Sequence, residues 1–126
     1  MAFGLLGHCK PAATTETLIY TAPANKKAVG SVTIMNSNTS DARASLVMTT
    51  TPATGTLTGL YTTAKAGTDP TKALALYNAL LKNTATDDGI PVVISGVVLG
   101  PGQSLVAYSE SGSALHYVFN GIEEAA

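Results

Sequence analysis

Charge is scarce in this sequence. Only 12% of its 126 residues are charged, which is about half the share usual for a soluble domain. Seven basic residues against eight acidic ones leave a net charge of −1. Because no basic stripe is present to displace counterions from phosphates, the composition argues against electrostatically driven nucleic-acid binding. So few charges on a small protein indicate that much of its surface meets other protein.

Cysteine and long apolar runs are also scarce. The single cysteine, Cys9, cannot form a disulfide within the chain, and this is typical of folding in a reducing compartment. No run approaches the roughly 18 to 20 apolar residues that a membrane span needs. The first residues have neither the basic start nor the full apolar stretch of a signal peptide. We therefore expect a soluble, unprocessed protein with no membrane partner.

The residues that are abundant favour β-structure. Hydrophobic residues make up 45% of the chain, enough for a core, and Thr, Ala, Gly and Ser are frequent. Short β-branched and apolar segments are separated by turns rich in Gly, Pro and Asn, and residues 42–49 show a clear period of two. Six or seven such segments predict an all-β fold, a single antiparallel β-sandwich that is Ig-like or jelly-roll-like. We expect this sandwich to occupy residues 16–126.

The N-terminal segment and the middle of the chain depart from this pattern. Residues 1–15 lack periodicity and predict an extended arm, flexible in isolation and ordered by a neighbour. Residues 50–70 predict a long loop with a short strand at residues 59–62. Asp69 and Pro70 then resemble a helix start, which predicts a short helix near 70–82, with a loop and strand as the competing interpretation. In the predicted helix, the large residues at helical spacing are Leu74, Tyr77 and Leu81. In the predicted arm, the residues expected to contact a neighbour are Phe3, Leu5 and Leu6.

The alternation within the strands also predicts which side chains form the core. In the strand over residues 29–35, Val32 and Ile34 share one face with Gly30, whereas Val29 and Met35 lie on the other. The same argument for the later strands completes the predicted core. Its members are Val32, Ile34, Leu46, Ile94, Leu105, Tyr117 and Phe119.

Residues able to carry chemistry are few. His8 and His116 are the only histidines, and together with Cys9 they are a candidate metal set. A metal site needs several such ligands to converge, so we favour reading His8 as an arm residue and His116 as a surface strand residue. Cys9 has no evident base to activate it as a nucleophile. The sequence therefore predicts no catalytic residue, no metal, no cofactor and no enzyme activity.

Two stretches of the sequence carry a resemblance to a known class of protein. The first runs from Leu18 to Asn36 and contains a strand, the turn beginning Ala22-Pro23, and an apolar strand that ends in Asn. The second comprises residues 96–109 and the ending Gly121-Ile122-Glu123-Glu124. Over residues 16–124 the chain resembles small virion structural proteins of tailed bacteriophages, including cyanophages. The resemblance implies a β-sandwich virion component without enzymatic activity, and it transfers no binding residue.

Two functions follow as hypotheses. The first is a virion structural protein, either a tail, baseplate or fibre component or a capsid decoration (cement) protein. It would be made in the host bacterial cytoplasm and would partner other virion proteins as a homo-oligomer, for which the resemblance favours a trimer. The second is a carbohydrate-binding module for host attachment, with Tyr61 and Tyr108 facing the glycan. Residues 91–119 contain no Lys or Arg, so we expect valines of the strands in this part of the chain to contact a neighbouring molecule. These valines are Val93, Val97, Val106 and Val118. The competing interpretation is that they face a second buried layer within the same chain.

Overall fold

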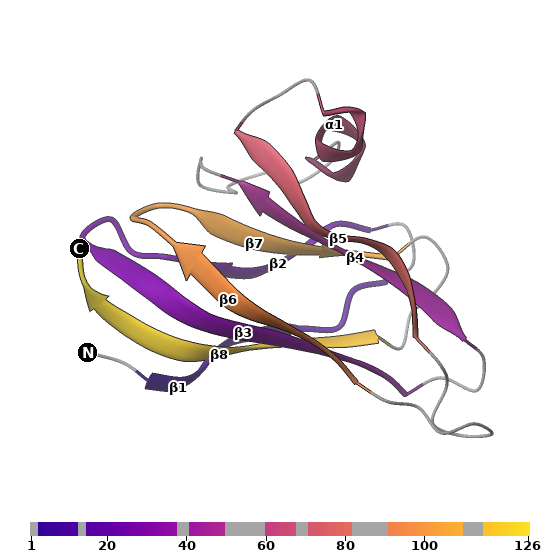
Figure 1. Cartoon of the computed structure of the whole chain (residues 1–126), viewed down its shortest axis with the longest axis horizontal. Helices are drawn as coiled ribbons and strands as arrows, with labels where there is room; N and C mark the ends of the chain where they lie inside the picture. The colour runs from indigo at the N-terminus through magenta and orange to yellow at the C-terminus, as the bar shows by residue number, and fades with distance from the viewer. Residues whose placement is uncertain are drawn as a thin grey trace.

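The computed structural model describes residues 3–12, 15–37, 41–49, 60–67, 71–81, 91–109 and 115–126. Over these ranges the chain forms eight strands and one helix (Figure 1). Their bounds are β1 Phe3–Cys9, β2 Thr17–Thr21, β3 Lys26–Asn36, β4 Ala42–Thr49, α1 Leu60–Ala66, β5 Lys72–Leu81, β6 Val92–Leu99, β7 Ser104–Tyr108 and β8 Leu115–Ala125.

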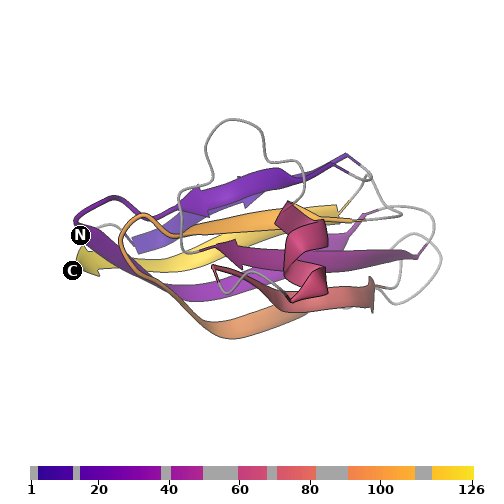
Figure 2. The same ribbon diagram turned by 90° about the horizontal axis from the view of Figure 1, so that it is seen from above.

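The strands form two antiparallel sheets that pack face to face (Figures 1 and 2). The first, called here the β8 sheet, has the order β1-β8-β3-β6, and the second, the β7 sheet, has the order β2-β7-β4-β5. The predicted all-β antiparallel sandwich is thus confirmed. The sequence left an Ig-like and a jelly-roll-like arrangement open. Eight strands in this order, four in each sheet, have the topology of a double-sheet jelly roll.

The core lies between the two sheets and follows the predicted alternation. Six of the seven predicted core side chains are fully buried, whereas Ile94 is only partly buried at the margin. Along β3, Val32 and Ile34 point into the core while Val29 and Met35 are exposed, so the predicted strand register is confirmed. Burial of these large side chains supplies the main driving force for joining the two sheets.

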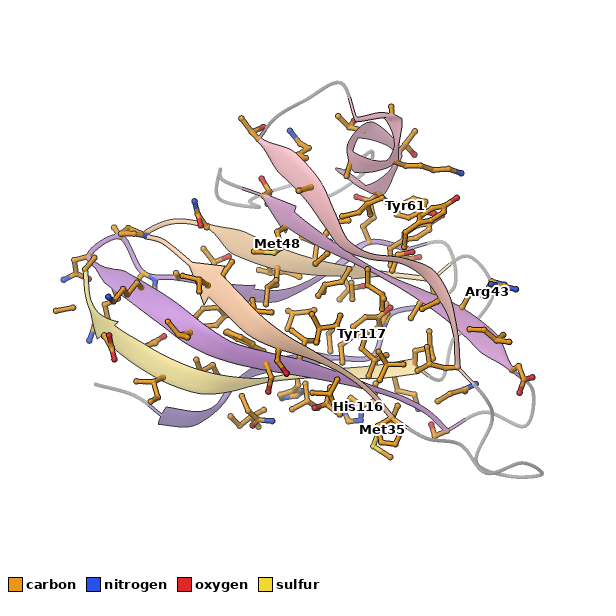
Figure 3. The ribbon with its side chains drawn as sticks, viewed as in Figure 1. Met35, Arg43, Met48, Tyr61, His116 and Tyr117 are labelled. Atoms are coloured by element: carbon orange, nitrogen blue, oxygen red, sulfur yellow. The ribbon has the colours of Figure 1, made fainter. Side chains whose placement is uncertain are left out.

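Tyrosine hydroxyls tie the sheets together through the core. Tyr117 on β8 donates to the backbone oxygens of Ser45 on β4 and Tyr108 on β7, at 3.1 and 3.0 Å (Figure 3). Tyr20 on β2 donates in the same way to a carboxylate oxygen of Glu123 on β8. Burial raises the pKa of both phenols, so each stays protonated and able to donate.

The predicted helix near 70–82 is wrong. Residues 72–81 form strand β5, and the helix lies earlier, over the residues for which a short strand was expected. Alanine and leucine alternate over residues 73–76, so this stretch satisfies a period of two as well as helical spacing. Pairing with β4, in which Leu76 lies opposite Leu46, decides between the two. The competing interpretation of a strand is therefore correct, and Asp69 and Pro70 lie outside the described residues.

Part of the N-terminal segment is paired within the sandwich. Residues 3–9 form β1 and run antiparallel to β8, from Phe3 opposite Ile122 to Cys9 opposite Tyr117. Without β1 the backbone groups on that side of β8 would lack these hydrogen bonds. Within this chain the segment is thus an edge strand of the β8 sheet. A role for residues 1–15 in contacting a neighbour stays a prediction.

The outer faces of the two sheets differ. Helix α1 packs on the outer face of the β7 sheet (Figures 1 and 2), where Tyr61 and Ala64 form a second apolar cluster with Val47 and Val106. No segment of the described ranges lies over the outer face of the β8 sheet (Figure 1). Within the described residues, α1 therefore covers part of the outer face of the β7 sheet, whereas the outer face of the β8 sheet has no such cover.

Candidate functional site

The described residues offer little for catalysis. In the ranges that the structure describes, no group of three or more His, Cys, Asp or Glu side chains is placed to hold a metal ion. Over the same ranges, no helix has the length and apolar character needed to cross a membrane. The feature that stands out is a surface, the outer face of the β8 sheet.

This outer face carries most of the large apolar side chains that solvent reaches. Leu5, Val93 and Val98 are the most open of them, at 59%, 57% and 54% exposed. Val29, Met35 and Ile122 are exposed on the same four strands, and only Tyr77 and Leu80 on β5 lie elsewhere among the exposed large hydrophobic residues of the described chain. Small monomeric proteins rarely leave such residues clustered on one face.

The strand register joins these residues into rows across the sheet. Val29 on β3 lies opposite Val98 on β6 and Ile122 on β8, which makes one apolar row. In a second row, Thr33 on β3 lies between Val93 on β6 and Val118 on β8. Since neighbouring strands are about 5 Å apart, side chains in a row touch and present a continuous surface.

Charge on these four strands is confined to one end. The charged residues of β1, β3, β6 and β8 are Lys26, Lys27, Glu123 and Glu124. Lys27 and Glu124 face each other across β3 and β8 and form an ion pair of 3.6 Å, with both side chains about half exposed. The rest of the face is apolar or neutral, as in the buried centre of a protein interface.

The predicted interface valines divide between this surface and the interior. Val93 is exposed on the outer face, and Val118 is partly buried in the same row, on the other side of Thr33. Val97 and Val106 are buried, so expecting them at the surface is wrong.

A bulge explains the position of Val97. Between Ile94 and Val97 lie two residues of β6, Ser95 and Gly96, whereas the partner strand has only one, and Gly96 has a φ of +72°. The extra residue reverses the alternation, so Val93 and Val98 point outward while Val97 points into the core. Val106, by contrast, lies on the outer side of β7 but beneath α1. For Val106, the interpretation of a second buried layer within the same chain is correct.

The residues proposed for arm contacts also differ in position. Leu5 is exposed on the outer face, whereas Leu6 packs against the core. Phe3 begins β1 opposite Ile122, and its side chain lies outside the described part of the structure. Of the two described side chains, Leu5 is the one that a neighbour could contact directly.

The two tyrosines considered for glycan binding stack on each other. The ring centroids of Tyr61 and Tyr108 are 4.0 Å apart. The ring of Tyr77 is nearly parallel to that of Tyr61, with the two centroids 6.4 Å apart. Tyr61 belongs to α1 and packs against the β7 sheet, so its side chain is only 4% exposed (Figure 3) and has no free ring face on which a sugar could stack. Tyr108 is partly buried beside it. The glycan-facing assignment is wrong for Tyr61, and the structure gives carbohydrate binding no support.

The histidines and the cysteine are separated by the sheet. His8 and His116 are both exposed on the outer face, with ring centroids 6.2 Å apart. Cys9 points the opposite way, into the core, where burial raises the pKa of its thiol to about 12. A thiol held protonated in the core is neither a nucleophile nor a third ligand for the histidines.

The outer face could not be recognised as a unit from the sequence. The placement of Val29 and Met35 away from the core side of β3 was the available signal. The contributions of β1 and β6 depend on pairing and on the bulge, which the local pattern does not reveal.

No protein-family model matches the sequence, and no curated protein matches it. A solved structure, that of a pentameric capsid protein isolated from metagenomic phage sequences, is similar with a TM-score of 0.41 and 20% sequence identity. The similarity covers 98% of this chain and 64% of that protein, so this chain spans less than two thirds of its length.

Proposed function

We propose that this chain is a non-enzymatic bacteriophage virion structural protein that docks through the outer face of the β8 sheet. The observation that carries the proposal is the apolar, nearly uncharged face formed by the rows around Val29 and Thr33. The resemblance of residues 16–124 to small virion proteins of tailed phages supports the same class. A virion is assembled from many copies of small domains, and such contacts need this kind of surface.

The outer faces of the two sheets differ in how far they are covered. Covering exposed aliphatic side chains is favourable, by about 25 cal/mol for each Å² of apolar surface removed from water. The β7 sheet gains this cover from α1 within the chain. The β8 sheet has no such cover within the described residues, and a neighbouring molecule would supply it. Confinement of charge to one end keeps the cost of removing ionic groups from water low.

The fold is compatible with this role without deciding it. Double-sheet jelly rolls occur in viral capsid domains, in lectins and in cupins. Function belongs to sites on a fold and not to the fold itself. The surface and the sequence resemblance therefore carry the proposal. The jelly roll is a fold that viral capsid domains also use, and it favours no one of its known functions.

Within the virion, we propose an accessory component that self-associates and contacts other virion proteins. Its place would be in a tail, baseplate or fibre, which the resemblance favours, or on the capsid as a decoration (cement) protein. The resemblance favours a trimer. The protein would be made in the host bacterial cytoplasm and then incorporated into particles.

The proposal is tested by charging the face. Val29→Lys and Val93→Lys place a cation in each of the two rows, at exposed positions that leave the core intact. Leu80→Lys is the matched control, because Leu80 is an exposed leucine on β5, outside the face. Analytical ultracentrifugation should show self-association of the original and control proteins and its loss in the other two. Co-sedimentation with phage particles should change in parallel.

The contrary result is equally clear. If the original protein stays monomeric at high concentration and associates with no virion protein, the proposed role is wrong. If both face variants assemble as well as the Leu80→Lys control, the outer face is not the docking surface.

A further inference from the structure

We propose that His8 and His116 together chelate a divalent transition-metal ion of the zinc class, bridging β1 to β8 on the outer face. This proposal rests on the geometry of the two histidines and does not depend on the virion role. The pair comes from opposite ends of the chain and is assembled only by the pairing of β1 with β8.

The register places the two side chains within reach of one ion. His8 lies directly opposite Val118, and His116 precedes Val118 by two residues on β8. The histidines are therefore diagonal neighbours on one face of an antiparallel pair, a relation that brings long side chains into contact. Their ring centroids are 6.2 Å apart and the ring planes are inclined by 76°.

This separation is close to the one a shared ion requires. A Zn–N bond is about 2.0 to 2.1 Å long, so two imidazoles on one tetrahedral ion have centroids roughly 5 to 5.5 Å apart. Both side chains are exposed, so small rotations about their χ angles close the remaining distance without disturbing the core. The paired backbone strands hold the two Cα positions fixed, which lowers the entropy lost on binding.

The ligand chemistry defines the class of ion. Neutral imidazole suits Zn²⁺, Cu²⁺ and Ni²⁺, whereas Mg²⁺ and Ca²⁺ prefer oxygen ligands. Two protein ligands leave positions on the ion for water, because no third His, Cys, Asp or Glu joins the pair among the described residues. Cys9 cannot contribute, since its side chain lies on the other side of the sheet. The site is thus an open, exchangeable one.

A bridging ion would act as a clamp on the N-terminal strand. Among the described strands, β1 lies at the edge of its sheet and pairs with β8 alone, and the ion would add a second link between them. In the unfolded chain the same histidines lie far apart and do not form this pair. An ion that prefers the native pair stabilises the folded protein in proportion to its excess concentration.

The test uses the full chain and zinc chloride alone. Isothermal titration calorimetry should show one Zn²⁺ per chain, with affinity reduced at least tenfold in His8→Asn and in His116→Asn. At a zinc concentration of about 100 times the dissociation constant, the Tm of the original protein should rise by roughly 5 °C or more. Neither single variant should show that rise, and circular dichroism verifies that each is folded.

Relocating one histidine gives a sharper test of geometry. In the His116→Asn background, Val118→His places a histidine directly opposite His8 and should restore both affinity and the rise in Tm. Ile122→His is the matched control, because it adds a histidine to the same face of β8 opposite Phe3, out of reach of His8. It should restore neither.

The proposal is overturned by any of three outcomes. In the first, each single variant binds zinc with the affinity of the original protein. In the second, zinc binds without raising the Tm. In the third, the Val118→His and Ile122→His variants behave alike, which would mean that the histidines bind singly.

Discussion

Removing the Tyr117 hydroxyl should destabilise the sandwich without changing its packing. Tyr117→Phe keeps the buried ring and deletes the one donor that reaches from β8 to the carbonyl groups of Ser45 and Tyr108. Those two residues lie opposite each other on β4 and β7, so the hydroxyl links one sheet to a ladder in the other. The variant therefore isolates a polar tie between the sheets.

The size of the effect follows from burial. A typical hydrogen bond contributes about 1 kcal/mol net, and a buried polar group left without its partner costs about 1 to 3 kcal/mol. Tyr117 is fully buried, so water cannot replace its hydroxyl without opening the core. Because the ring remains, no large cavity forms, and we expect the free energy of unfolding to fall by about 1 to 3 kcal/mol.

Urea unfolding followed by circular dichroism measures this loss, with an unchanged m-value showing that the folded state stays compact. Tyr77→Phe is the matched control, since Tyr77 is half exposed and its substitution should change stability by less than about 0.5 kcal/mol. If Tyr117→Phe is no more destabilising than this control, the hydroxyl does not tie the sheets and the reasoning fails.

Three further outcomes are expected. Leu46→Ala should lower the free energy of unfolding by about 2 to 5 kcal/mol in urea, because it opens a cavity between the sheets, and a loss below about 0.5 kcal/mol would mean the register is wrong. Gly30→Ala should lower the Tm strongly while Gly67→Ala, in open space, lowers it less, since a Cβ at Gly30 would lie 2.0 Å from the backbone oxygen of Asn120; equal effects would contradict this contact. Burial raises the pKa of the Cys9 thiol to about 12, so the native state keeps a proton that the unfolded chain loses above about 8.5. Stability should therefore fall between pH 8 and pH 10, and less steeply in Cys9→Ala; parallel slopes in urea unfolding would refute it.

Much of the sandwich is determined by local sequence. A period of two along β3 and β4 decides which side chains point inward, and this depends only on the alternation of adjacent residues. Val32, Ile34 and Leu46 could be assigned to the core on that ground, and they are fully buried. The turns rich in Gly, Pro and Asn likewise separate the strands because of their own backbone preferences.

Other features were decided by contacts between distant segments. Residues 73–76 satisfy both helical and strand spacing, and the pairing of β5 with β4 selects the strand. The bulge at Gly96 turns Val97 inward, and α1 covers Val106, so neither valine reaches the surface. Each outcome depends on which partner lies alongside, and a local pattern contains no such information.

The candidate surface and the histidine pair show the same division. The sequence by itself determined that the chain has few charges, that Val29 and Met35 face away from the core side of β3, and that only two histidines exist. Only the strand order β1-β8-β3-β6 brought His8 beside His116 and aligned Val29 with Val98 and Ile122. The physical reason is that alternation is set by each strand's own backbone, whereas sheet order is set by the free energy of burying all the apolar faces together.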